Sequence, residues 1–155
     1  MPGAETTSFL VRHAKAGSRE RWTEPDRNRP LTDAGRVQAT ALVDLIGNAV
    51  RAVQSSPYRR CTETVAPIAA ALGLLVEEEE RLAEGAGPEW AINQLSTVPG
   101  SVLCTHGDVM AEMVQLLTDE HVPMRGGMQW EKAGTWAVEV VRGSIVAARY
   151  LPPPV

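Results

Sequence analysis

The sequence contains little that would support metal chemistry, a disulfide framework or a membrane span. Its 155 residues include only three histidines and two cysteines. Cys61 and Cys104 form neither a metal-binding nor a disulfide pattern, and we expect both to be small buried hydrophobic residues. No apolar run approaches the roughly 20 residues of a membrane helix. The N-terminal MPGAETTS lacks the basic start and apolar stretch of a signal peptide. We therefore expect a cytoplasmic protein that does not act at membranes.

The chain also lacks an excess of positive charge. It has 15 Lys and Arg against 19 Asp and Glu, a net charge of −4, which argues against a general nucleic-acid-binding surface. A hydrophobic content of 44% and a charged content of 22% are ordinary for a globular protein. The length predicts a single domain over residues 1–155 with a substantial core. The closing LPPPV cannot extend a helix or a central strand and is expected to form a tail.

Short β-rich runs alternate with helical patterns along the chain. Predicted strands cover residues 8–11, 52–55, 74–76 and 101–104, and predicted helices follow Thr32, Ser56-Pro57, Pro88 and His106. An antiparallel pair, 135–141 with 144–150, turns at Arg142-Gly143. Residues 14–31 and 119–132 are expected to be loops. The alternation predicts an α/β fold, a three-layer sandwich with a mostly parallel central sheet and an antiparallel C-terminal hairpin.

Two of the predicted helices have a clear apolar face. The first, with Thr32 as its N-cap, is expected to bury one set of side chains: Ala34, Val37, Ala41, Leu42, Leu45 and Ile46. The second is expected to bury another: Cys61, Val65, Ile68, Ala69 and Leu72. Asp108 is expected to cap the helix that follows His106.

Arginine and histidine residues follow three of the predicted strands. Arg12 and His13 end the first strand, the second runs into Arg59 and Arg60, and His106 follows the fourth. Ligands of parallel sheets bind at the carboxyl ends of the strands, so we expect these side chains to converge. Guanidinium groups match phosphate oxygens, and a neutral histidine nitrogen can attack phosphorus to form a covalent intermediate. The pattern therefore favours a phosphoryl-binding site, although a single histidine after a strand usually has a packing or capping role.

Four segments resemble the signatures of the histidine phosphatase superfamily, whose members include phosphoglycerate mutases and phosphohistidine phosphatases. They are LVRHAKAG, RPLTDAGRVQA, SSPYRRCTETVAPIAAALGL and VLCTHGDVM, and they occur in the order and spacing of that family. The short chain, with little inserted, resembles the small phosphohistidine phosphatase subgroup, as does Ala14, where many members have glycine. The resemblance implies a phosphoglycerate mutase-like fold over most of the chain.

The resemblance also implies roles for individual residues. His13 would be the nucleophile, Arg12 and Arg60 would bind phosphate, and His106 would hydrogen-bond the phosphoryl oxygens. Many members have a carboxylate after the third strand that acts as a general acid, and Glu84 is the candidate here. The acidic run beside it, residues 77–80, makes this last assignment weak, because a charge run is usually a solvated face.

The expected function is phosphatase activity through a covalent phosphohistidine, without a cofactor or metal. The substrate would be a phosphorylated protein, for example one carrying phosphohistidine, or a small phosphorylated molecule. One alternative is a non-catalytic phosphate-binding or interaction module, because domains of this resemblance occur fused to nucleotide hydrolases. Another is a metal-dependent hydrolase, which is disfavoured because no two histidines lie at i, i+4 and no carboxylates cluster.

Overall fold

A central sheet of seven strands organises the protein. The computed structural model describes residues 5–155. Residues 1–4 lie outside the described residues. They are the first residues of the predicted domain and of the N-terminal segment that lacks a signal-peptide pattern. The elements are β1 (Glu5–Arg12), η1 (Asp26–Asn28), α1 (Asp33–Ile46), β2 (Ala52–Ser55), α2 (Arg59–Leu72), β3 (Val76–Glu78), η2 (Glu80–Leu82), α3 (Glu89–Thr97), β4 (Ser101–Thr105), α4 (Gly107–Asp119), β5 (Met124–Arg125), β6 (Thr135–Val141) and β7 (Ser144–Leu151).

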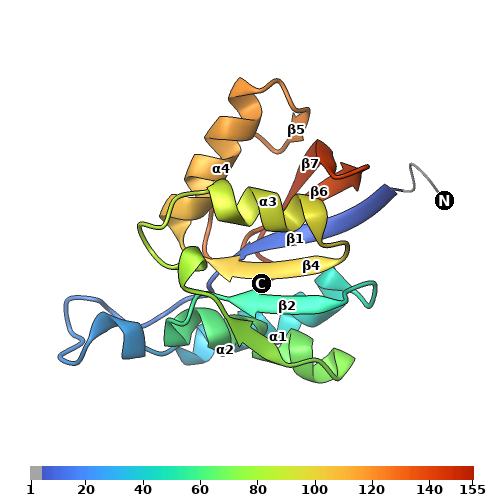
Figure 1. The fold of residues 1–155 in the computed structure, drawn as a ribbon. Coiled ribbons are helices and arrows are strands. Elements are labelled where there is room, and N and C mark those ends of the chain that lie inside the picture. The colour runs from blue at the N-terminus through green and yellow to red at the C-terminus, as the bar shows by residue number, and fades with distance from the viewer. Residues whose placement is uncertain (1–4) are drawn as a thin grey trace.

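The strand order is β3-β2-β4-β1-β6-β7-β5. The first four strands in this order pair in parallel, and β6 and β7 form the antiparallel hairpin. Helices α1 and α2 cover one face of the sheet, and α3 and α4 cover the other (Figure 1). This confirms the predicted three-layer α/β sandwich with its C-terminal hairpin.

Alternation along β1 divides the core into two layers. Phe9 and Val11 pack in the cluster with α1 and α2, whereas Leu10 packs in the cluster with α3 and α4. Successive side chains of a strand point to opposite faces, so a strand covered on both faces is apolar throughout. The two cysteines are buried as predicted and belong to the layer beneath α1 and α2.

The predicted buried face of α1 is wrong in part. The buried residues are Gly35, Gln38, Ala39, Leu42 and Ile46, whereas Ala34, Val37 and Leu45 are exposed. The helix packs against the protein through the face that carries Gly35 and Gln38, and not through the face with the most apolar side chains. A Cβ at Gly35 would lie 2.0 Å from the Lys15 carbonyl oxygen, and Gln38 Oε1 accepts a hydrogen bond from the Lys15 amide at 3.0 Å.

Two strand assignments differ from the prediction. The third strand covers Val76–Glu78 instead of 74–76. The Leu74 amide donates a hydrogen bond to the Ala69 carbonyl at the end of α2, and Leu75 is exposed, so neither residue pairs in the sheet. The predicted loop 119–132 contains β5, which pairs in parallel with β7. Two residues between a proline and a glycine are too few to give a periodic signal.

The loop after β1 and the C-terminal tail have tertiary partners. The loop contains η1 and a single bridge between Ala16 and Leu31. Leu151, predicted to begin the tail, instead ends β7 opposite Thr135, and only residues 152–155 lie outside the sheet. A backbone oxygen of Val155 accepts a hydrogen bond from Gln38 Nε2 at 3.2 Å. Within residues 5–155, no helix has the length and apolar character needed to cross a membrane.

Candidate active site

The carboxyl ends of β1, β2 and β4 lie side by side and position the predicted site. Arg12 is in register with Thr105, and Ser55 is in register with Cys104. The His13 amide donates to the Thr105 carbonyl at 3.1 Å, which holds the chain beside β4 for one residue beyond the strand. His106 follows Thr105 directly, so the two histidine rings meet with their centroids 5.6 Å apart.

His13 is buried, with 5% of its surface exposed, and its ring orientation is set by the backbone of the next residue. Its Nδ1 lies 2.8 Å from the Ala14 carbonyl oxygen. A carbonyl can only accept a hydrogen bond, so in this contact Nδ1 carries the proton and Nε2 keeps its lone pair. The Ala14 amide donates in turn to Thr64 Oγ1 at 2.9 Å, which fixes this turn against α2.

The environment keeps His13 neutral. Burial lowers its pKa to about 3, and the charges of Arg60 and Arg12 act in the same direction, against the hydrogen bond to Ala14. A histidine with this pKa is unprotonated at neutral pH. A ring with one protonated nitrogen and one free lone pair is the form that can attack phosphorus.

Arg60 is fully buried and held by residues far from it in the sequence. Its Nη1 donates to the Asp26 carbonyl oxygen and its Nη2 donates to Asp26 Oδ2, both at 3.0 Å. Asp26 also accepts from Arg29 Nε at 2.9 Å. Burial raises the pKa of Asp26, but hydrogen bonding to Arg29 and the charge of Arg60 lower it further than burial raises it. The ionised carboxylate that holds the Arg60 guanidinium is therefore favoured. Asp26 was not predicted, and an acidic residue in a polar loop carries no signal that would single it out.

His106 is held by Ser56, a residue of the SSPYRR segment for which no role was predicted. Ser56 Oγ lies 2.9 Å from His106 Nε2 and also accepts a 3.3 Å hydrogen bond from the Tyr58 amide. Tyr58 packs edge-on against the same ring, with centroids 4.7 Å apart. These contacts leave Nδ1 of His106 as the nitrogen available to a ligand.

Glu84 lies beside the predicted phosphate-binding residues and pairs with them. Its Oε1 is 3.2 Å from Arg60 Nη2, 3.0 Å from Arg19 Nη2 and 3.6 Å from His106 Nδ1. Asp108, expected to cap α4, does not do so, because His106 occupies the N-cap position. Its carboxylate instead accepts from the Gly85 amide at 2.7 Å, so it ties the Glu84 loop to the start of α4.

Three of the predicted site residues have buried polar atoms without a hydrogen-bond partner among the described residues. These atoms are Arg12 Nε, Arg60 Nε and His106 Nδ1. Buried polar groups are normally satisfied, and unsatisfied ones mark places where a ligand or water completes the site. Each of these nitrogens can donate a hydrogen bond to a phosphoryl oxygen, and such charge-assisted bonds from arginine are among the strong ones.

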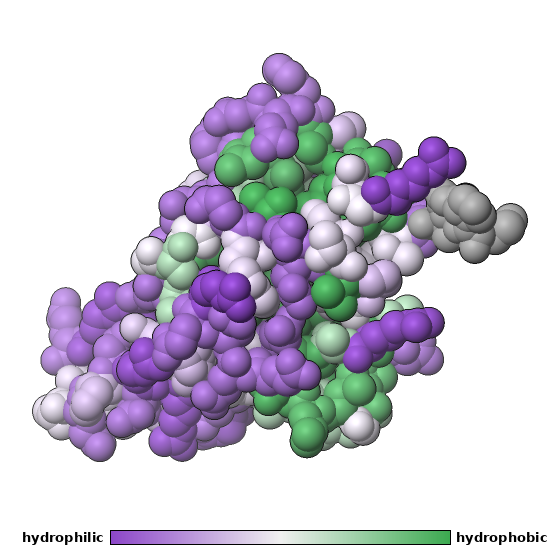
Figure 2. Space-filling view, in the orientation of Figure 1, coloured by the Kyte–Doolittle hydropathy of each residue, from purple (hydrophilic) through white to green (hydrophobic). Residues whose placement is uncertain are grey.

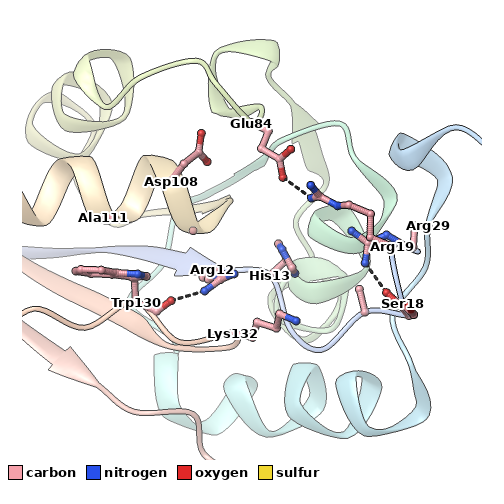
Figure 3. Close-up of a pocket in the computed structure, with 13 residues that line it drawn as sticks. Arg12, His13, Ser18, Arg19, Arg29, Glu84, Asp108, Ala111, Trp130 and Lys132 are labelled. Atoms are coloured by element: carbon pink, nitrogen blue, oxygen red, sulfur yellow. Dashed lines mark hydrogen bonds and ion pairs between the residues drawn. The ribbon is translucent and has the colours of Figure 1, made fainter. Parts of the chain in front are cut away.

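A cavity of about 730 Å³ opens beside these residues (Figure 3). Arg12, His13 and Glu84 line it, whereas Arg60 and His106 do not line it and instead contact the Glu84 carboxylate. The side of the molecule that carries the loop 13–32 is largely hydrophilic (Figure 2). The structure therefore brings all five predicted residues together, and the Glu84 carboxylate lies in the cavity wall in contact with Arg60 and His106.

The chain matches the model of the histidine phosphatase superfamily, branch 1, over residues 8–99. It is 31% identical to the 8-oxo-(d)GTP phosphatase of Mycolicibacterium smegmatis over 96% of the chain and 48% of that relative. The chain belongs to the histidine phosphatase superfamily. It spans about half the length of this curated relative.

Solved structures of the superfamily have the same fold. A candidate phosphohistidine phosphatase SixA from Agrobacterium tumefaciens superposes with a TM-score of 0.71 and 21% identity, covering 96% of this chain and 98% of that one. Another candidate SixA, from Nakamurella multipartitia, gives a TM-score of 0.67 and 24% identity over 97% of this chain and 96% of that one. The small phosphohistidine phosphatases are thus good structural matches for this chain, as its sequence predicted.

Gly107 offers a first test of the site, because it leaves room for Arg12. A Cβ at this position would lie 2.7 Å from Cζ of Arg12, whose Nη1 donates to the Trp130 carbonyl at 2.7 Å. Gly107→Ala should displace the guanidinium and lower kcat/KM for an aryl phosphate about 10²-fold, the cost of a misplacement of about 1 Å. Thermal unfolding should be little changed, since the clash falls on a flexible side-chain end. An unchanged kcat/KM would show that the present position of Arg12 is not required.

Proposed function

We propose that this chain is a phosphatase that transfers a phosphoryl group from its substrate to His13 and then to water. The observation that carries the proposal is the neutral, buried His13, held through Nδ1 beside two arginines and a second histidine. The nitrogens of Arg12, Arg60 and His106 that lack a partner among the described residues support it, because each can donate a hydrogen bond to a phosphoryl oxygen. Family membership supports the same chemistry.

In the first step, Nε2 of His13 attacks phosphorus, a P–N bond forms, and the bond from phosphorus to the leaving group breaks. The arginines and His106 donate to the phosphoryl oxygens, on which charge is spread in the transition state. In the second step, water attacks the phosphohistidine, the P–N bond breaks and its electron pair returns to Nε2. The proton lost by water passes to solvent, and inorganic phosphate leaves.

Glu84 bears on which leaving groups the site accepts. Its carboxylate is engaged in ion pairs with Arg19 and Arg60 and is therefore not positioned as a free acid for a leaving group. An alkoxide is too basic to leave well without a proton, and a positioned acid typically accelerates that step about 10²–10⁴-fold. The imidazole released from a phosphohistidine has a conjugate-acid pKa of about 6.5 and leaves without such help. We therefore propose substrates with weakly basic leaving groups, phosphohistidine proteins among them, ahead of alkyl phosphates.

The relative from Mycolicibacterium smegmatis is named for 8-oxo-(d)GTP, and this chain spans 48% of it. We assign to the chain the phosphoryl-transfer chemistry that its own residues support, and not the nucleotide of the longer protein. A non-catalytic module would bind phosphate at the same residues without turnover, so an activity measurement separates the two functions.

A generic aryl phosphate tests the proposal directly. Two guanidinium groups and a histidine can supply the positive charge that a metal would provide in other phosphatases. Hydrolysis is therefore expected to proceed at the same rate in excess chelator as in its absence. Activity that falls in chelator and returns with zinc or magnesium would favour a metal-dependent hydrolase. Phosphate binding without hydrolysis under either condition would favour the non-catalytic module.

A further inference from the structure

Lys132 is a cation of the cavity that the proposed reaction does not use. It precedes Ala133, whose amide donates to the carbonyl oxygens of Arg12 and His13 at 3.2 and 3.1 Å. This contact places Lys132 on the cavity wall beside the nucleophile. Figure 3 shows its side chain extending along the cavity below His13, with no ion pair or hydrogen bond to another residue drawn.

The surroundings of Lys132 are strongly positive. Partial burial lowers its pKa, and repulsion from Arg12, Arg29, Arg60 and Lys15 acts in the same direction. In the described part of the chain, no salt bridge joins Lys132 to a carboxylate, whereas Arg19, Arg29 and Arg60 all have one. A cation held among cations without a partner is stabilised when an anion binds beside it.

Arg29 lines the same cavity and is nearly fully buried, with 6% of its surface exposed. Its Nε donates to Asp26 Oδ1 at 2.9 Å and its Nη1 donates to the Gly17 carbonyl oxygen at 2.5 Å. These bonds fix the guanidinium in the wall. Lys132 thus provides the uncompensated positive charge, and Arg29, although paired with Asp26, adds a fixed guanidinium to the wall, in addition to the residues assigned to the transferred phosphoryl group.

The cavity also has room for more than one phosphoryl group. Its volume of about 730 Å³ lies within the range of sites that enclose whole small molecules, about 300–1,000 Å³. The positive charge of Arg29 and Lys132 therefore faces space that the remainder of a substrate would occupy, and that remainder should carry negative charge.

The cavity calls for negative charge on the remainder of the substrate, and the engagement of Glu84 calls for a weakly basic leaving group. A phosphate leaving group meets both requirements. It is negatively charged, and its second pKa of about 6 lets it depart without protonation. It therefore suits a site in which Glu84 is engaged in ion pairs with Arg19 and Arg60. An alkyl phosphate meets neither requirement, and an aryl phosphate meets only the second.

We propose that the site acts on diphosphates and that Lys132 and Arg29 bind the phosphate that leaves. The inference rests on the proposed function, since it uses the same nucleophile. Nε2 of His13 forms a P–N bond to the terminal phosphorus while the P–O bond of the anhydride breaks. The bridging oxygen keeps the electron pair and departs on the organic monophosphate. Water then cleaves the phosphohistidine, giving inorganic phosphate and one proton.

The experiment compares ADP with p-nitrophenyl phosphate, both of which have weakly basic leaving groups. Only ADP carries a second phosphate. The wild-type protein should have at least a tenfold higher kcat/KM for ADP and release phosphate and AMP in equal amounts. Lys132→Ala should lower kcat/KM for ADP at least tenfold and change that for the aryl phosphate less than threefold. Lys132→Arg, which keeps the charge, should retain most of the ADP activity.

Lys15→Ala is the matched control, because Lys15 is a nearby exposed lysine that does not line this cavity. It should leave both activities unchanged. Equal losses on the two substrates in Lys132→Ala, or no wild-type preference for ADP, would overturn the inference while leaving the phosphatase in place. A phosphohistidine peptide preferred over ADP would also overturn it. Absence of turnover by the wild-type protein on every substrate would instead contradict the proposed function.

Discussion

Replacing His13 with alanine is expected to reduce turnover of an aryl phosphate by at least about 10⁴-fold, because the variant has no atom that can accept the phosphoryl group. Losses of this order or larger follow removal of a catalytic nucleophile in other enzymes. The fold should be retained, since the change removes a neutral ring at the carboxyl end of β1 and leaves the backbone hydrogen bonds of residues 12–14 in place. Circular dichroism and thermal unfolding check this point.

Rapid quenching of the wild-type protein should trap phosphate on His13. A phosphoramidate survives alkali and is lost in acid, the reverse of a phosphoserine, so the stability of the label identifies the bond. His121→Asn is the matched control: His121 is exposed and has φ of 63°, which asparagine tolerates. It should be labelled and active like the parent. Substantial turnover in His13→Ala would rule out His13 as the essential nucleophile.

Arg60→Lys is expected to lower kcat/KM for an aryl phosphate by roughly 30- to 1,000-fold, which corresponds to about 2–4 kcal/mol of transition-state stabilisation. Lysine keeps the charge but has one nitrogen in place of three. Two nitrogens of Arg60 are already engaged by Asp26, and the third, Nε, is the unpartnered one. A single ammonium cannot both hold Asp26 and donate to the phosphoryl group.

Arg59→Lys is the control for this experiment, because it makes the same change one residue earlier. Arg59 is exposed and pairs along the helix with Glu63 at 2.9 Å, away from the histidines. An exposed pair of this kind contributes little, so kcat/KM should stay within about twofold of the parent. A large loss in Arg59→Lys with none in Arg60→Lys would move the phosphate-binding role to Arg59.

Local patterns in the sequence predicted most of the fold. The strands at 52–55 and 101–104, the hairpin turning at Arg142-Gly143 and the buried face of α2 agree closely with the structure. The predicted buried face of α1 did not agree, because Gly35 and Gln38 contact the Lys15 backbone. This close contact, and not the most apolar set of side chains, decides which face of the helix is buried. Hydrophobic periodicity identifies a helix well and identifies its contact face less reliably when backbone approach decides the packing.

The sequence by itself determined which residues end the three central strands, and so it placed Arg12, His13 and His106 at one edge of the sheet. That inference needs only strand positions and the rule for parallel sheets. The family signatures selected Arg60, rather than its neighbour Arg59, and proposed Glu84. These assignments follow from short segments, in which a residue's neighbours along the chain define its place.

Only the tertiary structure decided how these groups are held. Asp26 reaches Arg60 across 34 positions of sequence, and Glu84 reaches it across 24. Lys132 comes into the cavity because the Ala133 amide bonds the end of β1, about 120 positions earlier. Contacts of this length depend on the whole chain having folded, since no local propensity encodes which loop meets which strand end. The tertiary structure therefore decided the engagement of Glu84 in ion pairs and the unpartnered charge of Lys132, the two features from which the substrate class is inferred.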